Sequence, residues 1–404
     1  MTTAYTIASN PVNNKKTVGV VIEVATMQPN LAERRSKSWA PYIDAKLGFR
    51  NHWYPVLLGS EVGEGSPVPV KLLGEQMLLN RVEGRIFAIK DRCLHRGVTL
   101  SDRIECYSKQ TISCWYHGWT YRWDSGKLVD ILTNPKSVQI GRHALKTYHV
   151  EEVQGVVFVY VGDGEPHALL EDVPPGFLDA DRAIEGQHRL VAANWRMGAE
   201  NGFDAGHVFI HKSSILLDGN DIALPLGFAP GDADQLTRSE ITPGAPIGVF
   251  DLLGEHSVPV FEGVVEGETV VRGHFGEKTV ARSISIWLPG VLKVDPFPDP
   301  SLTQYEWYVP VDGDHHLYFQ MLGRQVSSEA ERDDFTREFH DKWVDLALNG
   351  FNDDDILARE SMQAFYADGR GWQEEILFEP DSAIIEWRRL ASQHNRGLQT
   401  EAHL

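Results

Sequence analysis

Two short segments, each with one cysteine and one histidine, constrain this chain more than any other feature. Cys93 and His95 stand in the first, CLHRG, and Cys114 and His117 stand in the second, CWYHGW, with 18 residues between His95 and Cys114. On facing loops, these two hooks can place four ligands around one metal centre. Two cysteines with two histidines suit either a tetrahedral zinc ion or a [2Fe–2S] cluster in which histidines replace the cysteines on one iron.

The way the ligands are divided between the hooks favours the cluster. Zinc-finger hooks usually pair cysteine with cysteine and histidine with histidine, at other spacings. Here each hook supplies one cysteine and one histidine. Two facing loops must do so if they are to hold a cluster in which one iron has only cysteine ligands and the other only histidine ligands. Cys106 is left over and is interpreted as a packed or loop thiol. An odd number of cysteines, with no apolar N-terminal leader, predicts a reducing cytoplasm.

Length and charge limit the classes of protein to which the chain can belong. Its 404 residues suggest two domains, and 42% hydrophobic with 24% charged residues is ordinary for a soluble globular protein. The formal net charge of −19 argues against nucleic acid or an anionic membrane as the main partner. No apolar run approaches the roughly 18 residues of a membrane-spanning helix.

Short strand-like runs surround the two hooks and predict a small all-β domain over residues 50–165. Turn signals such as Glu83-Gly84 separate them. The expected strands are Trp53–Leu58, Val68–Leu72, Met77–Val82, Arg85–Lys90, Ile112–Trp115, Thr120–Trp123 and Gly155–Val161. Residues 1–49 are polar at first and then predict one or two short helices within Leu31–Leu47, which we expect to pack on the second domain.

Residues 166–392 predict a mixed second domain, so the chain as a whole is α+β. A capping box at Ser328-Glu-Ala-Glu331 begins a helix whose aromatic residues recur at helical spacing and are interpreted as core. Further helices are expected at Asp354–Tyr366 and Asp381–Ala391, and a loose tail at 393–404. The expected strands are Ile247–Leu253, Val270–Phe275, Val280–Leu288, Tyr305–Val311 and Leu317–Leu322.

A second candidate metal site lies in the segment Asn194–Ser214. His207 and His211 are four residues apart, so a helix would place them on one face. Asp204 would join the same side. A histidine pair at this spacing is by itself more often structural than metal-binding.

Three glycines in the same segment, Gly198, Gly202 and Gly206, recur every four residues. Each makes a regular helix less favourable by about 1 kcal/mol relative to alanine. Two interpretations follow. The helix is distorted near Asn201–Gly202, which would turn the Gly202 carbonyl toward a substrate, or bare backbone packs closely against a neighbouring element.

Together, the two constellations resemble the Rieske non-heme iron aromatic-ring-hydroxylating oxygenases. The hooks look like the Rieske motif of that family, and Asn201, Asp204, His207 and His211 look like its catalytic motif, Asn-x-x-Asp-x-x-His-x₃₋₄-His. The resemblance covers nearly the whole chain. It implies a Rieske [2Fe–2S] domain followed by a helix-grip catalytic domain, in which helices cover an antiparallel sheet. The hook cysteines would hold the inner iron and the hook histidines the outer one.

The resemblance also implies a mononuclear Fe(II) site in the second domain. Two histidines and one carboxylate on one face of the iron leave positions open for O₂. In the family this carboxylate comes from an aspartate five residues before a glutamate. Asp355 has that spacing to Glu360 and is the expected third ligand beside His207 and His211, with Asp354 as the reserve.

Asp204 resembles the family's bridging aspartate, which would link His207 to His117 of a neighbouring subunit. Asn201, in the same motif, is assigned to catalysis with it. Such a bridge makes sense only with a neighbour's cluster close by, so the resemblance implies a homotrimer. Electrons would come from a ferredoxin with a ferredoxin reductase upstream. Candidates for a basic patch facing the ferredoxin are Arg92, Arg96, Lys109 and Arg122.

Residues 194–204, 285–290 and 350–355 resemble one branch of the family, which adds both atoms of O₂ to an angular and an adjacent ring carbon. The implied substrates are carbazole and related polycyclic heteroaromatics such as dibenzofuran and dibenzo-p-dioxin. The implied pocket positions are mostly apolar or small, as a flat aromatic substrate requires. They are Gly202, Ile284, Leu292, Val294, Phe297, Phe351 and Asn352.

Other functions remain compatible with parts of this pattern. The same two metal centres serve Rieske monooxygenases of the oxoquinoline, steroid or O-demethylase type, and the motifs do not separate these from dioxygenases. An electron-transfer Rieske protein or a zinc-stapled binding module would explain the hooks alone. Chain length and the second histidine motif argue against both of these smaller alternatives.

Overall fold

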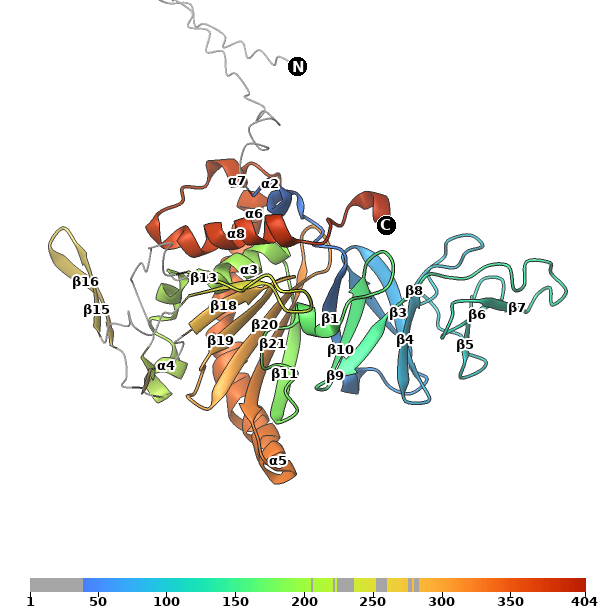
Figure 1. The fold of residues 1–404 in the computed structure, drawn as a ribbon, viewed down its shortest axis with the longest axis horizontal. Coiled ribbons are helices and arrows are strands. Elements are labelled where there is room, and N and C mark those ends of the chain that lie inside the picture. The colour runs from blue at the N-terminus through green and yellow to red at the C-terminus, as the bar shows by residue number, and fades with distance from the viewer. Residues whose placement is uncertain are drawn as a thin grey trace, which may run out of the picture.

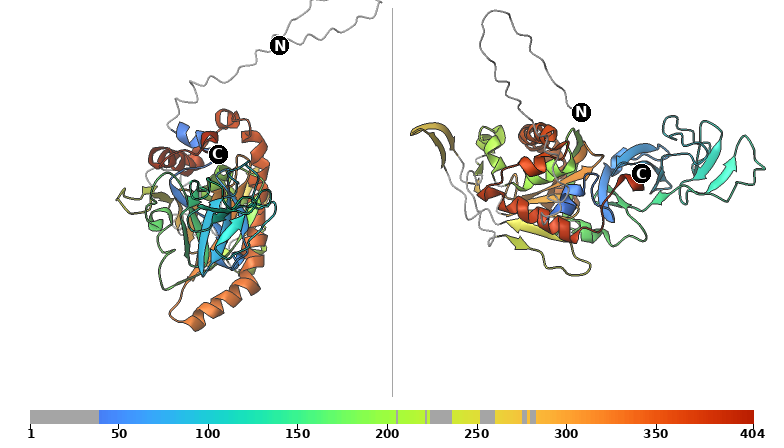
Figure 2. Two further views of the ribbon diagram at one scale, coloured as in Figure 1. Left: turned by 90° about the vertical axis from the view of Figure 1, so that its right-hand side faces the viewer. Right: turned by 90° about the horizontal axis from the view of Figure 1, so that it is seen from above.

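The computed structural model describes residues 39–204, 206–220, 222–223, 236–251, 260–274, 278–279 and 283–404. Most of the expected N-terminal helical segment therefore lies outside the described residues. Its described part contains α2, Ala40–Asp44, which packs against α8, Ser382–His394, where the Tyr42 N–H donates to Ser392 Oγ at 3.1 Å. The molecule is elongated, with small sheets at one end and the β15–β16 hairpin, Val260–Val265 and Glu268–His274, at the other (Figures 1 and 2).

Three small sheets form the first domain, with strand orders β1-β10-β9, β2-β3-β4-β8 and β5-β6-β7. The strands are β1 His52–Leu58, β2 Val68–Leu72, β3 Glu75–Val82, β4 Arg85–Lys90, β5 Thr111–Ser113, β6 Trp119–Arg122, β7 Leu128–Ile131, β8 Thr147–Tyr148, β9 Val150–Val153 and β10 Val156–Val161. All the strands expected in this domain are present, and no end is shifted by more than two residues. The sequence missed β7, β8 and β9, which are too short to show a periodicity.

A seven-stranded antiparallel sheet with the order β11-β21-β20-β19-β18-β14-β13 forms the centre of the second domain. The strands are β11 Arg182–Val191, β13 Thr237–Arg238, β14 Gly248–Asp251, β18 Ser283–Trp287, β19 Val291–Asp295, β20 Leu302–Pro310 and β21 His316–Gln325. The sequence missed β11, β13 and β19, and the expected strand Val270–Phe275 belongs to the projecting hairpin. Parts of three expected strands, 252–253, 275 and 280–282, lie outside the described residues. A separate parallel pair joins β12, Ile222–Ala223, to β17, Lys278–Thr279.

Strand β20 is buried along its whole length because both faces of the sheet are covered. Trp307 packs on Phe158 of the first domain, with ring centroids 6.2 Å apart. Tyr308, the next residue, belongs to the core beneath the helices. Since successive side chains point to opposite faces, Gln304 and Glu306 also face the helices.

Helices of the second domain cover that inner face (Figure 1). The longer ones are α3 Trp195–Phe203, α5 Glu329–Glu338, the π-helix η6 Phe339–Phe351, α6 Asn352–Tyr366 and α8; the shorter ones are α4 Ile215–Asn220, α7 Gly371–Glu374, η3 His207–His211 and η7 Glu379–Asp381. Three further 3₁₀ turns lie elsewhere in the chain: η1 Gly59–Glu61 between β1 and β2, η2 Leu169–Asp172 between β10 and β11, and η8 Glu401–His403 at the C-terminal end. As predicted, Ser328 Oγ accepts from the Glu331 N–H and begins α5. No helix in the described part of the chain is long and apolar enough to span a membrane.

The prediction of a loose tail at 393–404 is wrong. Gln399 is buried, where its Oε1 accepts from Arg50 Nη1 at 2.6 Å and its Nε2 donates to the Leu73 carbonyl at 3.0 Å. The Arg396 carbonyl accepts from Asn51 Nδ2 at 2.7 Å. The segment therefore crosses from α8 onto the first domain and ties the domains together. A single buried polar residue such as Gln399 produces no periodic pattern, so the sequence could not reveal this contact.

Candidate metal centres

The two hooks lie on neighbouring loops of the first domain. Cys93 follows β4 and Cys114 follows β5, and both are buried, while His95 is exposed and His117 is half-buried. His95 Nδ1 lies 3.1 Å from His117 Nδ1. Hydrogen bonds from the Cys114 thiol and the Tyr121 hydroxyl lower the pKa of the Cys93 thiol. A buried cysteine pair and a more exposed histidine pair are the arrangement that a cluster with two unlike irons requires.

Each hook is closed by a glycine in the left-handed region. The Gly97 N–H donates to the Cys93 carbonyl at 2.9 Å, and the Gly118 N–H donates to the Cys114 carbonyl at 2.8 Å. The φ angles of these glycines are 71° and 69°, which glycine adopts without a Cβ clash. Tyr121, which the sequence did not reveal as a site residue, places its hydroxyl 3.3 Å from Cys93 Sγ. The hooks are thus two copies of one turn.

His207, His211 and Asp355 form a second group, whose ligand atoms lie within 4.8 Å of one another. Asp355 Oδ1 lies 3.5 Å from Nε2 of each histidine. His207 Nδ1 donates to the Asp204 carbonyl, which leaves Nε2 to face Asp355. Asp354, the reserve candidate, is half-exposed and approaches His211 at Nδ1, 3.7 Å away. The structure therefore brings together the expected set with Asp355 as its carboxylate.

This group fits a divalent metal ion. Asp355 Oδ1 and both ring nitrogens of His211 are buried without a hydrogen-bond partner among the described residues. An unpartnered buried polar atom costs about 1–3 kcal/mol, which coordination would recover. Burial would raise the pKa of Asp355, but His211 and His207 hold it well below its ordinary value, so the carboxylate is ionised. Two histidines and one carboxylate are the ligand set of non-heme Fe(II).

The spacing of the two histidines suggested a shared α-helix, but the structure does not place them on one. Helix α3 ends before Asp204, whose backbone is extended, and the histidines lie on the 3₁₀ turn η3. The distortion expected at Asn201–Gly202 is therefore not at that position: α3 continues through both residues, and the chain leaves the helix only after Phe203. Gly202 instead serves close packing: a Cβ there would lie 2.0 Å from the Tyr308 hydroxyl.

Gly202→Ala should therefore lower the free energy of unfolding by about 1–3 kcal/mol. The added methyl would displace the Tyr308 hydroxyl, which donates to Glu306 Oε2 at 2.5 Å. Gly219→Ala in α4 is the matched control, because no described atom lies within 4 Å of its Cβ position. It should be neutral or stabilising by up to about 1 kcal/mol. Urea denaturation compares the two variants, and equal stabilities would contradict the packing role.

The candidate catalytic residues Asp204 and Asn201 have different partners. The Asp204 carboxylate accepts from the Gly206 N–H at 2.7 Å, and the Asp204 backbone carbonyl accepts from His207 Nδ1. Asn201 Oδ1 accepts from Arg359 Nε at 2.6 Å. Arg359 is fully buried on α6, one turn beyond Asp355. This bond joins α3 to the helix that carries the carboxylate.

A cavity beside the histidine–aspartate group is lined by every expected substrate position, from Gly202 to Asn352, together with His207 and Asp355. Further lining residues, which the sequence did not reveal, are Val208, Gln304, Glu306 and Arg359. Burial raises the pKa of Glu306. The alternation of polar and aromatic residues in β20 is a signal that could have placed Gln304 and Glu306 on the site-facing side. Arg359 carries no such signal.

Comparison with known proteins decides the family. The homotrimeric ring hydroxylase family matches residues 160–399, and the Rieske [2Fe-2S] domain matches residues 52–149. The chain is 76% identical to the terminal oxygenase component of carbazole 1,9a-dioxygenase from Sphingomonas sp., over 92% of this chain and 98% of that protein. The chain belongs to the homotrimeric ring hydroxylase family.

This ring hydroxylase is also similar to solved structures of carbazole 1,9a-dioxygenase oxygenases. The terminal oxygenase of carbazole 1,9a-dioxygenase from Novosphingobium sp. KA1 is 75% identical, with a TM-score of 0.89 over 92% of this chain and 99% of that one. The reduced complex between oxygenase and ferredoxin in carbazole 1,9a-dioxygenase contains a 58% identical chain, with a TM-score of 0.88 over 92% and 95%. The predicted family and fold class are confirmed: a Rieske [2Fe–2S] domain precedes an α+β catalytic domain.

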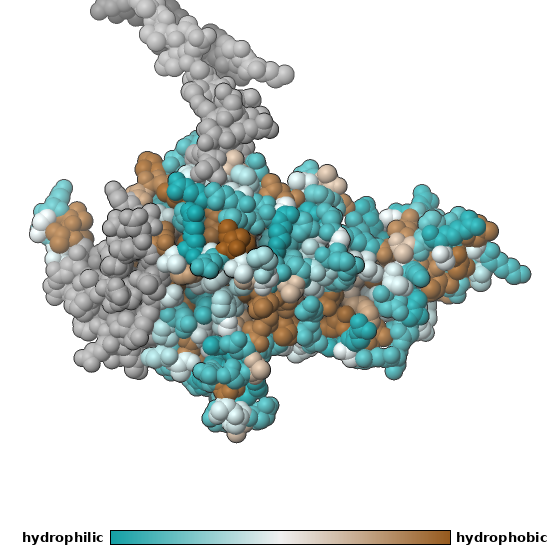
Figure 3. Space-filling view, in the orientation of Figure 1, coloured by the Kyte–Doolittle hydropathy of each residue, from teal (hydrophilic) through white to brown (hydrophobic). Residues whose placement is uncertain are grey.

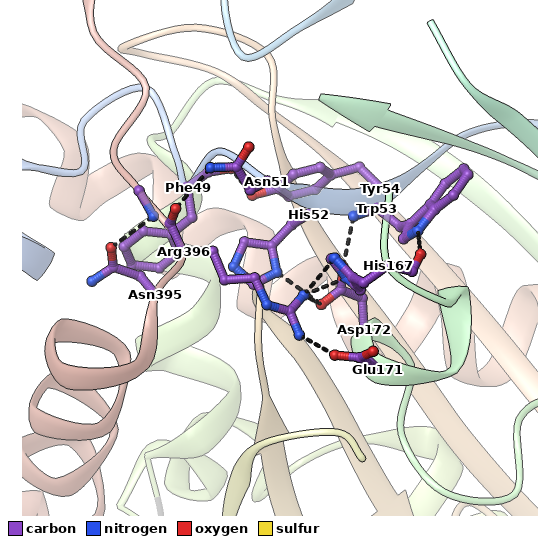
Figure 4. Close-up of polar contacts among 11 residues, drawn as sticks. Phe49, Asn51, His52, Trp53, Tyr54, His167, Glu171, Asp172, Asn395 and Arg396 are labelled. Atoms are coloured by element: carbon purple, nitrogen blue, oxygen red, sulfur yellow. Dashed lines mark hydrogen bonds and ion pairs between the residues drawn. The ribbon is translucent and has the colours of Figure 1, made fainter. Parts of the chain in front are cut away.

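A further group of two histidines and one aspartate in this ring hydroxylase is an ion-pair cluster (Figure 4). Asp172 accepts from His52 Nδ1 at 2.8 Å, His167 Nε2 at 2.7 Å, the Trp53 N–H at 2.8 Å and Arg396 Nη1 at 3.0 Å. The guanidinium supplies the positive charge that a metal ion would bring. Burial would raise the pKa of Asp172, but His52 and His167 hold it well below its ordinary value.

Asp172→Asn should destabilise the protein by about 1.5–3 kcal/mol, because a neutral amide replaces the charged acceptor of several hydrogen bonds at a buried position. A depressed carboxyl pKa contributes stability that is complete above about pH 4 and is lost as the pH falls through the folded-state value. Urea denaturation between pH 7 and pH 3 should show the gap to wild type narrowing in acid. Asp163→Asn, whose side chain is 75% exposed beside Arg50, is the control and should cost less than about 1 kcal/mol.

Proposed function

We propose that this ring hydroxylase is the terminal oxygenase of a multicomponent dioxygenase that performs angular cis-dihydroxylation of carbazole and related polycyclic heteroaromatics, such as dibenzofuran and dibenzo-p-dioxin. The observation that carries the proposal is that the His207, His211 and Asp355 group borders a mostly apolar cavity. The name of the 76% identical relative supports the substrate. When bound, the Rieske cluster supplies electrons and the mononuclear Fe(II) supplies O₂ activation.

The cavity walls are suited to hold a flat aromatic ring next to the ligand group. Phe351 stacks on the His211 ring with centroids 3.6 Å apart, and Phe297 lies 5.3 Å from Phe351. Ile284 and Leu292 add aliphatic surface. These side chains bury an apolar substrate and exclude water from the reacting carbons. The absence of a side chain at Gly202 leaves backbone at the wall.

The shape of one chain supports electron transfer between neighbouring copies. The hook loops near β5–β7 lie at one end of the molecule, and α3, which leads into η3, lies well away in the second domain (Figure 1). A second copy in a homotrimer can bring its His117 to the Asp204 of the first. We therefore assign Asp204 as the bridge, with Asn201 anchoring the helix before it.

An exposed, partly apolar surface around His95 suits a ferredoxin as electron donor. Leu94, Tyr116 and Leu132 are each about half-exposed, and hydrophobic side chains gather at this end of the molecule (Figure 3). Of the four basic candidates, Arg122 is paired with Asp124, which leaves Arg92, Arg96 and Lys109 to attract an acidic ferredoxin. A ferredoxin reductase would act upstream. Unpaired cysteines fit a cytoplasmic location.

Turnover with isotopically labelled O₂ tests the function. The protein is reconstituted with a ferredoxin, a reductase and carbazole, and the product is analysed by mass spectrometry. Two labelled atoms in one product molecule are expected, and omission of the ferredoxin should abolish product. One labelled atom would show a monooxygenase instead. Electron transfer through the protein without any oxygenated product would show an electron carrier.

A further inference from the structure

The side-chain amide of Asn352 is hydrogen-bonded at every position it offers. Its Nδ2 donates to Asp355 Oδ2 at 3.0 Å and to Glu306 Oε1 at 3.4 Å. Its Oδ1 accepts from Gln320 Nε2 at 3.1 Å and from Gln304 Nε2 at 3.4 Å. An asparagine amide has two donor hydrogens and two acceptor lone pairs, so all four are used.

The direction of this amide is set by a residue that can only donate. Arg189 Nε donates to Gln320 Oε1 at 3.1 Å, and a guanidinium has no acceptor. The Gln320 oxygen must therefore face Arg189, and its nitrogen donates to the Leu348 carbonyl at 2.7 Å and to Asn352. Since the Asn352 oxygen accepts that bond, its nitrogen faces Asp355. The hydrogen-bond network therefore determines the orientation of the Asn352 amide.

We propose that Asn352 is a positioning residue for the iron ligand Asp355, and that the relay Arg189–Gln320–Asn352 sets its direction. The inference rests on the proposed iron site. Asn352 holds Asp355 Oδ2, whereas Oδ1 has no hydrogen-bond partner among the described residues and lies 3.5 Å from Nε2 of both histidines. The carboxylate is thus fixed to present one oxygen to the metal. Asn352, expected as a substrate contact, acts through the ligand.

Burial makes this relay hard to replace with water. Gln320 is fully buried, and Asn352 and Asp355 are each 2% exposed. Arg189 begins the relay on the edge strand β11, where its Nη2 also donates to the Leu348 carbonyl at 2.8 Å. One arginine therefore anchors the end of η6 to the sheet and orients the amide behind the ligand. Loss of such an outer partner typically lowers metal affinity or activity by about 10- to 100-fold.

Two variants test the inference without changing an iron ligand. Asn352→Leu removes the donor to Asp355 Oδ2. Gln320→Glu keeps the size and satisfies Arg189, but offers only acceptors, so the Asn352 amide must turn its oxygen toward Asp355. Both should lose Fe(II) to a chelator about 10- to 100-fold faster than wild type. The EPR spectrum of the nitric oxide adduct should change, while the visible spectrum of the Rieske cluster stays the same.

Asn349→Asp is the matched control, because Asn349 Oδ1 accepts from Gln187 Nε2 at 2.9 Å and an acid keeps that acceptor. It should release Fe(II) at the wild-type rate. Wild-type release and an unchanged EPR spectrum in Asn352→Leu would overturn the positioning role. A change in Asn352→Leu but not in Gln320→Glu would overturn the relay. Wild-type protein that binds no mononuclear iron would instead overturn the proposed function.

Discussion

His211→Ala should lower the bound iron from about three to about two per chain and abolish product formation. His211 is fully buried, and neither ring nitrogen has a hydrogen-bond partner among the described residues, so its ring is available for coordination only. The cluster ligands belong to another domain, and the visible spectrum of the cluster should be unchanged. Elemental analysis of iron together with that spectrum measures the result.

His316→Ala is the matched control for this loss. His316 is equally buried in the second domain, where Nδ1 bonds to the Ala193 carbonyl at 2.7 Å and burial lowers its pKa to about 3. It is a neutral structural histidine outside the ligand group. The control should keep all of its iron. A third iron retained at full occupancy in His211→Ala would refute the ligand assignment.

Asp204→Asn should leave both centres loaded yet slow electron transfer between them by about 100-fold, the upper end for loss of an outer partner. Asparagine keeps an oxygen that can accept from the Gly206 N–H, so the turn from α3 to η3 is preserved while the charge is lost. Oxidation of the reduced cluster in a single turnover, followed by stopped-flow absorbance with substrate and O₂, gives the rate.

The same isosteric change at Asp354 provides the comparison. Asp354 is half-exposed and 3.7 Å from His211 Nδ1, so it shares the neighbourhood without belonging to the proposed path. Asp354→Asn should transfer electrons at the wild-type rate and keep its iron. An unaltered single-turnover rate in Asp204→Asn would exclude the bridging role.

Features contained in a short stretch of sequence could be predicted. The hooks around Cys93 and Cys114 and the pair His207 and His211 are local patterns whose residue types follow from metal chemistry. Asp355 is different, because periodicity alone reads it as one acid in a helix N-terminus. Only the spacing that it shares with the family assigned Asp355 to the same site as the two histidines. The structure also places it there.

Features that depend on tertiary contacts could not be predicted. Strand β11 lies at the sheet edge with most of its residues half-exposed, so it shows no apolar alternation. The partnership of Asn201 with Arg359 joins residues far apart in the sequence, and so does the burial of Gln399 against Arg50. The spacing of His207 and His211 suggested one α-helix, because residues four apart lie on one helix face. In the structure the chain turns at Asp204, and the 3₁₀ turn that follows brings the two histidines together equally well.

The ligands of the two centres differ in how far apart they lie along the chain. Those of the cluster fall within residues 93–117, inside strands β1 to β10, which among the described strands pair with one another and with no strand of the second domain. Those of the mononuclear site lie at His207, His211 and the distant Asp355. Because domains generally fold as units and N-terminal ones first during synthesis, the strands that carry the cluster ligands can pair before the ribosome has made Asp355. All four cluster ligands therefore emerge during synthesis before the residue that completes the second site.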